Sequence, residues 1–142
     1  MQNPYVDLMK SSGALQASAA VRSRELWRSY FADMQRRATE GQGKARELWQ
    51  SYQQELRAAG AGDDFAERIA TAQSNFQSAY AEVEDKYIKA SREREQDLAE
   101  SLAALDAEYS QDVVASIIRY FEAIRECLPK AARERSAGNS TS

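Results

Sequence analysis

The sequence of 142 residues contains no histidine, one cysteine, two prolines and six glycines. Without histidine the chain lacks the commonest general base near neutral pH. Its single cysteine, Cys127, cannot form an internal disulfide, and no set of cysteines and histidines is present to hold zinc. So few glycines and prolines leave too few turn residues for a protein of many strands. We therefore expect an all-α protein without enzymatic activity, bound metal or cofactor, in which Cys127 packs in an apolar row.

The residues that commonly fill protein cores are also scarce. Leucine, isoleucine, valine and phenylalanine together number 23, whereas alanine alone numbers 25. Such a composition cannot fill a broad layered core and is typical of long helices with narrow apolar stripes. Carboxylate clusters such as Glu82, Glu84 and Asp85 lie among other charged residues, so we interpret them as parts of a solvated face.

Long apolar runs are absent as well. The most apolar window, residues 113–121, is interrupted by Ser116 and Arg119 and is far shorter than the roughly 20 residues that span a bilayer. Residues 1–13 lack the cationic start and the apolar run of a secretory signal. We therefore expect a cytoplasmic protein, either free or associated with the surface of a granule or a membrane.

Charge is unevenly distributed along the chain. Residues 1–62 have a net charge of +3, residues 63–128 of −8 and residues 129–142 of +2. A basic first half and an acidic second half attract each other when a chain folds back on itself or pairs with a second copy. The overall charge of −3 disfavours nucleic acid as a partner. We therefore expect a homo-oligomer that does not bind nucleic acid.

The first part of the chain predicts a loose segment followed by helical structure. Residues 1–13 contain Pro4, Ser11, Ser12 and Gly13, so we expect them to form a flexible lead-in. The next stretch, 14–59, shows a helical spacing of apolar residues throughout. Gly41 and Gly43 each cost a helix about 1 kcal/mol relative to alanine. This stretch therefore forms either one broken helix or two shorter helices, at about 14–39 and 44–59.

The second part of the chain predicts a single long helix. The one strong turn lies at residues 59–64, where a glycine with positive φ can close the first helical stretch and Asp64 can cap the next. No glycine or proline follows until Pro129, so we predict one helix at about 64–128. We expect an elongated helical hairpin or coiled coil, in which this helix packs against the N-terminal stretch. That hairpin forms a single domain, 14–128, followed by a disordered tail, 129–142.

Large residues of the long helix recur every eleven positions, and we predict that they pack against the N-terminal stretch. Eleven residues make three turns of 3.67 residues each, so such a row stays nearly straight along a helix. The main row consists of Phe65, Phe76, Tyr87, Leu98, Tyr109 and Tyr120. Two sister rows are Ile69, Tyr80, Leu102, Val113 and Ile124, interrupted at Ser91, and Ala72, Val83, Leu105 and Cys127, interrupted at Arg94 and Ser116.

The first part of the chain repeats a short motif at twice that interval. Arg-Glu-Leu-Trp-x-Ser-Tyr occurs at residues 24–30 and again at 46–52. Two interpretations remain open: either both copies dock equivalently on the long helix, or their aromatic residues form an amphipathic interfacial face. For the second interpretation the candidate surface or partner-binding residues are Leu26, Trp27, Tyr30, Phe31, Leu48, Trp49 and Tyr52.

The chain resembles the phasins, small helical proteins that coat bacterial polyhydroxyalkanoate granules. The resemblance depends on the aromatic-spaced segment 76–80 (Phe-Gln-Ser-Ala-Tyr) with Tyr87, on Asn3-Pro4-Tyr5, on chain length and on the lack of histidine and disulfides. It implies a structural role in controlling granule size and surface properties, with no catalytic residues. The length of the predicted second helix has no counterpart that we can match in that family.

These features predict a non-enzymatic amphipathic helical structural protein that self-associates and coats or organises an apolar surface, such as a polyester granule or a lipid surface. One alternative is a coiled-coil scaffold or adaptor that acts only through protein–protein contacts, with its aromatic rows buried between helices. Another is a helical component of a specialised secretion system. The first two differ in whether the aromatic face is free.

Overall fold

The computed structural model describes residues 3–60, 62–128 and Gly138. These residues form two long α-helices, α1 at Pro4–Ala59 and α2 at Phe65–Cys127, joined by a turn. No β-strand occurs in the residues that the structure describes. The all-α helical hairpin predicted from the sequence is therefore confirmed.

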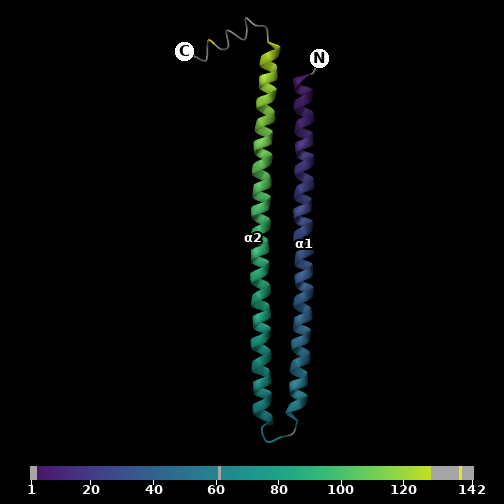
Figure 1. The fold of residues 1–142 in the computed structure, drawn as a ribbon, viewed down its shortest axis with the longest axis vertical. Helices are drawn as coiled ribbons and strands as arrows, with labels where there is room; N and C mark the ends of the chain where they lie inside the picture. The colour runs from purple at the N-terminus through teal and green to yellow at the C-terminus, as the bar shows by residue number, and fades with distance from the viewer. Residues whose placement is uncertain (1–2, 61, 129–137, 139–142) are drawn as a thin grey trace. The chain divides into compact units, whose positions relative to one another are not determined.

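The helices divide into two compact units, each of which contains part of both helices. The terminal unit comprises Met1–Leu26 and Glu100–Ser142, and the turn unit comprises Trp27–Ala99. In each unit a segment of α1 runs antiparallel to a segment of α2 (Figure 1). The tail predicted to be disordered, 129–142, lies outside the described residues apart from Gly138.

The prediction of a flexible lead-in at residues 1–13 is wrong, because α1 already begins at Pro4. The side-chain oxygen of Asn3 accepts hydrogen bonds from the backbone N–H groups of Tyr5, at 3.0 Å, and Val6, at 3.4 Å. Asparagine is a preferred N-cap residue, and proline suits the first helical position because it has no N–H that needs a partner. The Asn3-Pro4 pair is therefore a helix start.

The predicted break near residue 41 is also wrong, because α1 continues through both glycines. Gly41 lies where a Cβ atom would be 3.9 Å from Cδ2 of Tyr87 in α2. Most helical stability in proteins comes from tertiary packing rather than from intrinsic propensity. Packing against an uninterrupted α2 therefore offsets the cost of Gly41 and Gly43.

We expect Gly41→Ala and Gly43→Ala each to raise the free energy of unfolding by about 0.5–1 kcal/mol. A Cβ at residue 41 makes only an ordinary contact, and a Cβ at residue 43 meets nothing within 4 Å. Thermal unfolding followed by circular dichroism would measure the change. Gly60→Ala is the matched control and should destabilise the protein, because Gly60 has a φ of 56°. A lower Tm for either helical variant would contradict the expectation.

The turn is organised by Gly60, Asp64 and Arg68. The positive φ of Gly60 ends α1 as predicted. Asp64 stands before the first residue of α2, and its carbonyl accepts the N–H of Arg68 at 3.0 Å. Its carboxylate lies 3.2 Å from Nε of Arg68, whose guanidinium also donates to the carbonyl of Ala58 at 3.1 Å. Arg68 thus satisfies a carbonyl near the end of α1 from the first turn of α2.

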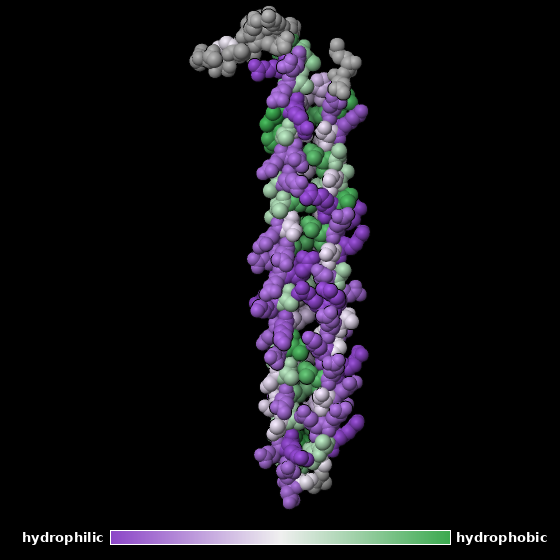
Figure 2. All heavy atoms as spheres, in the orientation of Figure 1, coloured by the Kyte–Doolittle hydropathy of each residue, from purple (hydrophilic) through white to green (hydrophobic). Residues whose placement is uncertain are grey.

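The contact between the helices buries few side chains. In each unit, apolar residues gather along the line where the two helices meet (Figure 2). The buried residues among those that the structure describes are Ala59, Ala72, Leu98, Leu105 and Ser116, and none of them is fully buried. In the main eleven-residue row Leu98 is buried, while the half-buried members are Phe76, Tyr109 and Tyr120 and the exposed ones are Phe65 and Tyr87.

The polar residues that interrupt the two sister rows are not turned toward solvent. Ser116 is buried, and Ser91 and Arg94 are half-buried. Ser116 Oγ accepts a hydrogen bond from Arg119 at 3.3 Å, whereas the buried hydroxyl of Ser91 has no hydrogen-bond partner. Cys127 is exposed, and its predicted packing role is wrong, because it is the last residue of α2.

Candidate functional site

Arg94 makes the main polar contact between the helices of the turn unit. Its Nε donates to Oδ2 of Asp33 at 2.8 Å, and its Nη2 donates to the hydroxyl of Ser29 at 3.4 Å. The guanidinium also lies 5.9 Å from the centroid of the Tyr30 ring. The Arg94 side chain is only 17% exposed. A half-buried ion pair adds little net stability, but a shift in register would leave its charges unpaired, so we infer that it favours the observed pairing.

A second ion pair joins the helices in the terminal unit. Arg22 Nη2 donates to Oε2 of Glu108 at 2.8 Å, and about half of each side chain is exposed. This hydrogen bond and the charge of Arg22 hold the pKa of Glu108 below its ordinary value of 4.5. The hydrogen bond from Arg94 likewise holds the pKa of Asp33 below its ordinary value of 3.8.

We expect the Tm to fall at acid pH because both carboxylates have lowered pKa values in the folded chain. A lowered pKa stabilises the fold above the ordinary value of the group, and this contribution disappears as the pH falls through the folded value. The loss should therefore begin near pH 4.5, the ordinary pKa of Glu108, and continue below pH 3.8, that of Asp33. Thermal unfolding at pH 7 down to pH 2.5 measures it. Asp33→Asn should flatten the dependence more than Glu108→Gln, and an unchanged pH profile in Asp33→Asn would contradict this account.

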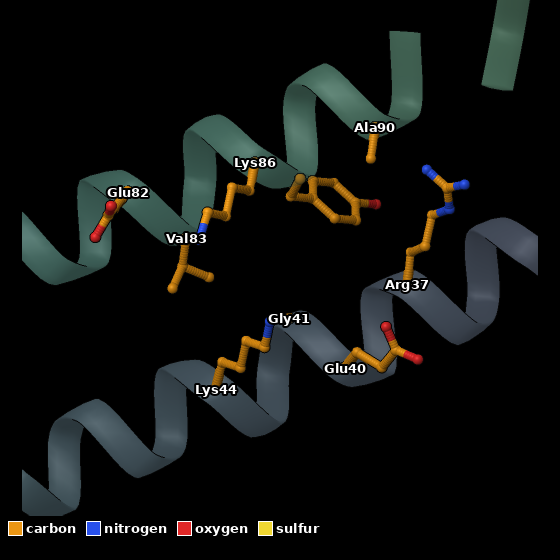
Figure 3. Close-up of a pocket in the computed structure, with 9 residues that line it drawn as sticks. Arg37, Glu40, Gly41, Lys44, Glu82, Val83, Lys86 and Ala90 are labelled. Atoms are coloured by element: carbon orange, nitrogen blue, oxygen red, sulfur yellow. The ribbon is translucent and has the colours of Figure 1, made fainter. Parts of the chain in front are cut away.

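One flank of the turn unit, which we call the charged flank, is lined by residues of both signs. It contains a groove of about 330 Å³ between α1 and α2 (Figure 3). The charged side chains that line this groove are Arg37, Glu40, Lys44, Glu82 and Lys86. Interspersed charges of both signs are typical of a solvated surface, so the charged flank is not our candidate site.

The other flank of the turn unit is apolar, and we call it the apolar flank. Its groove, of about 350 Å³, is lined by Ala38, Gly41, Gln42, Ala45, Tyr80, Val83, Glu84, Tyr87 and Ile88. Trp27 and Trp49 lie eleven residues before and after Ala38. Because eleven residues are three helical turns plus about 20°, these side chains project in nearly the same direction. Phe31 likewise lies eleven residues before Gln42 and projects in nearly the same direction.

Large side chains on the apolar flank are unusually exposed. Trp27 is 42% exposed, Phe31 61% and Trp49 49%, all from α1. From α2, Tyr80 is 38% exposed and Ile88 47%. Exposed apolar side chains that gather on one face of a protein mark an interaction surface, whereas isolated ones do not. The apolar flank is therefore our candidate functional site.

The structure divides the seven residues that we predicted as a surface. Trp27, Phe31 and Trp49 lie on the apolar flank, whereas the half-buried members of the set are Leu26, Tyr30, Leu48 and Tyr52. The exposed rings rest on the half-buried ones. The ring centroid of the half-buried Tyr30 is 6.0 Å from that of Trp27 and 5.5 Å from that of Phe31. Each motif copy thus contributes both half-buried and exposed residues.

The second aromatic cluster links the two helices. The ring centroid of Trp49 lies 5.7 Å from Tyr52 and 5.9 Å from Phe76 of α2. Tyr52 is also 5.1 Å from Phe76, which in turn stacks on Tyr80 at 5.9 Å. Aromatic pairs at these separations contribute stability beyond the area that they bury. The exposed Trp49 is therefore held in place by its neighbours.

The terminal unit also has two unlike flanks. A groove on one flank is lined by Asp7 and Arg119, which directly precede the half-buried Leu8 and Tyr120. In a pair of antiparallel helices, the residues that directly follow the inward-facing Leu8 and Tyr120 lie on the flank opposite to the groove. The exposed apolar residues expected there are Tyr5, Met9 and Phe121, and Val114 and Ile117 lie within two turns of Phe121 on α2.

Sequence reasoning missed the α2 part of these flanks. Ile88 and Phe121 directly follow Tyr87 and Tyr120 of the main row and are 33 residues apart, three intervals of eleven. They therefore belong to a further row beside the predicted packing row. That row was detectable from the same periodicity, but its other members, such as Gln77 and Ala99, are not large and apolar.

Among the described residues, no stretch of either helix has the length and the apolarity that crossing a membrane requires. In the same part of the chain, no three acidic, histidine or cysteine side chains converge where they could hold a metal ion. Comparison with known protein families, curated proteins and solved structures finds no match to this chain.

Proposed function

We propose that this chain is a non-enzymatic structural protein that coats an apolar surface through the apolar flank of its turn unit and self-associates when no such surface is present. The exposure of Trp27, Phe31 and Trp49 on one flank, opposite a charged flank, supports this proposal most directly. An amphipathic helix lies at an interface with its apolar side toward the apolar phase and its charged side in water.

Polyester granules and lipid surfaces both present an apolar phase to such a flank, and the phasin resemblance favours the polyester. Most of the exposed large side chains on the apolar flank are aromatic, and tryptophan and tyrosine combine an apolar ring with a polar group. Such residues suit the boundary between an apolar surface and water. In the proposed function, binding thus depends on contact over a broad area of the flank and not on a pocket for one small molecule.

The experiment is tryptophan fluorescence and co-sedimentation of the purified chain with polyhydroxybutyrate particles, with phosphatidylcholine vesicles and with neither. Both tryptophans lie on the apolar flank and are exposed. At a chain concentration low enough to prevent self-association, we expect their emission to shift to shorter wavelength, and the protein to sediment with the particles, when an apolar surface covers the flank. Binding to vesicles alone would replace the polyester by a lipid surface. If neither surface shifts the emission or sediments the protein, the coating function is wrong.

A second candidate function is a scaffold that acts only through protein–protein contacts. The observation in its favour is the small interior of the helix pair, in which no large side chain among the described residues is fully buried. A pair of helices with so little core gains stability when further helices pack on it. This scaffold would give a defined oligomer without binding to particles or vesicles, so the same experiment separates the two functions.

A further inference from the structure

We propose that in the free protein a second copy of the chain covers the apolar flank of the turn unit, with α1 of each copy packed on α2 of the other and both turns at the same end. The proposal rests on the function proposed above and identifies what occupies the same flank before an apolar surface is met. The two copies are related by a two-fold axis parallel to the helices, which gives a four-helix bundle whose neighbouring helices are all antiparallel.

Side-chain sizes on the apolar flank support this arrangement. Ala38 of α1 and Ile88 of α2 line the same groove and lie at one level of the helix pair. Trp27 lies eleven residues before Ala38, and Ala99 lies eleven residues after Ile88. Because the two helices are antiparallel, Trp27 and Ala99 are also at one level. At these two levels one residue is large and the other is small, and α1 is large where α2 is small. Packing α1 on the partner's α2 places large side chains against small ones, as close packing requires.

The alternative dimer, in which α1 packs on α1 and α2 on α2, fits less well. With a two-fold axis at Ala38, it would set Ala38 against the partner's Ala38 and leave a gap between them. Trp27 would then meet Trp49 of the partner, because the two tryptophans are equally far from Ala38. Large residues would face large ones, and small residues would face small ones.

Charge favours the same arrangement. Within the turn unit, the segment of α1 contains six basic and four acidic residues, whereas the segment of α2 contains five basic and seven acidic ones. Glu84 lines the groove of the apolar flank, and Glu95 lies eleven residues further along α2. In the alternative dimer they would lie against the partner's α2 segment, whose net charge is negative. On the partner's α1 they face a helix of net positive charge, which includes Arg46.

The apolar flank leaves large side chains for a partner to cover. Trp27, Phe31 and Trp49 are 42%, 61% and 49% exposed, and Ile88 of α2 is 47% exposed. Burial of such side chains in an interface stabilises a dimer.

The test is disulfide cross-linking between two differently marked chains. Both carry Cys127→Ser to remove the native thiol; a tagged chain carries Ala38→Cys, and an untagged chain carries Ile88→Cys. After mixing and oxidation we expect a covalent dimer of one tagged and one untagged chain, while Ala38→Cys alone should give none. Lys44→Cys mixed with Lys86→Cys, on the charged flank, is the matched control and should not cross-link. Light scattering of the wild-type chain should give twice its mass of 15.9 kDa.

Three results would overturn the proposal: a monomeric mass, cross-linking of Ala38→Cys with itself, or cross-linking across the charged flank. The cross-linked dimer should also fail to sediment with polyhydroxybutyrate particles and should regain binding after reduction. If the reduced protein does not bind particles either, the coating function fails while the cross-linking pattern still supports the dimer. If the chain is a monomer and binds particles, the dimer is wrong and the coating function is supported.

Discussion

The triple variant Trp27→Gln, Phe31→Gln and Trp49→Gln should bind apolar particles about a hundredfold more weakly than the wild-type chain. Complete burial of a large apolar side chain contributes about 1.5–3 kcal/mol. These three side chains are 42%, 61% and 49% exposed, so a covering surface adds roughly half of that for each. The sum is about 3 kcal/mol, and each 1.4 kcal/mol changes an equilibrium tenfold. Co-sedimentation at a series of particle concentrations, with the chain dilute enough to prevent self-association, gives the affinity.

The matched control for this variant changes the charged flank. Glu40→Gln, Lys44→Gln and Lys86→Gln alter three side chains that line the charged groove and should leave particle binding nearly unchanged. Circular dichroism should show that both variants remain helical at low temperature, because none of the replaced residues is buried. Equal losses of binding in the two variants would indicate that charge or overall stability, and not the apolar flank, causes adhesion.

Leu98→Ala should lower the free energy of unfolding by about 2–3 kcal/mol, the largest change that we expect from a single side chain. Leu98 is 6% exposed and is one of the few large buried residues in the described chain. Leucine-to-alanine substitutions in closed cores cost about 2–5 kcal/mol. The lower part of this range applies because the helix pair can close part of the gap. Chemical denaturation followed by circular dichroism measures the change.

Leu105→Ala makes the same change in the terminal unit, where Leu105 is 8% exposed, and should have a similar effect. Ile118→Ala is the control, since Ile118 is 51% exposed and its truncation should cost less than about 0.5 kcal/mol. Equal destabilisation by all three substitutions would indicate that Ile118 is covered in solution and that a partner buries more than the apolar flank of the turn unit.

Several elements of the fold follow from local sequence properties. The absence of glycine and proline between Phe65 and Leu128 leaves no position at which α2 must end, and Gly60 supplies the positive φ that closes α1. The start of α1 was equally local, because Asn3-Pro4 is a good N-cap followed by a good first helical residue. We missed it because Pro4, Ser11, Ser12 and Gly13 are residue types typical of loops, and the prediction gave them more weight than this local signal.

The candidate site was predictable only in part, because periodicity identifies an apolar stripe but not the line along which the partner helix meets it. Leu26 and Trp27 are adjacent in the motif, and only the position of α2 makes the first half-buried and the second exposed. The same reason explains Ser91 and Arg94, which break an apolar row and yet are half-buried.

The sequence by itself determined that two helical parts of the chain meet at a turn between Ala59 and Phe65, because helix formers, caps and breakers act over a few residues. Only the tertiary structure decided that α1 continues through Gly41, that Arg94 pairs with Asp33 and that Trp27, Phe31 and Trp49 remain exposed. These outcomes depend on which residues of the other helix lie opposite. Neighbours along the chain do not specify that pairing, because it is set by contacts between residues as far apart as Asp33 and Arg94.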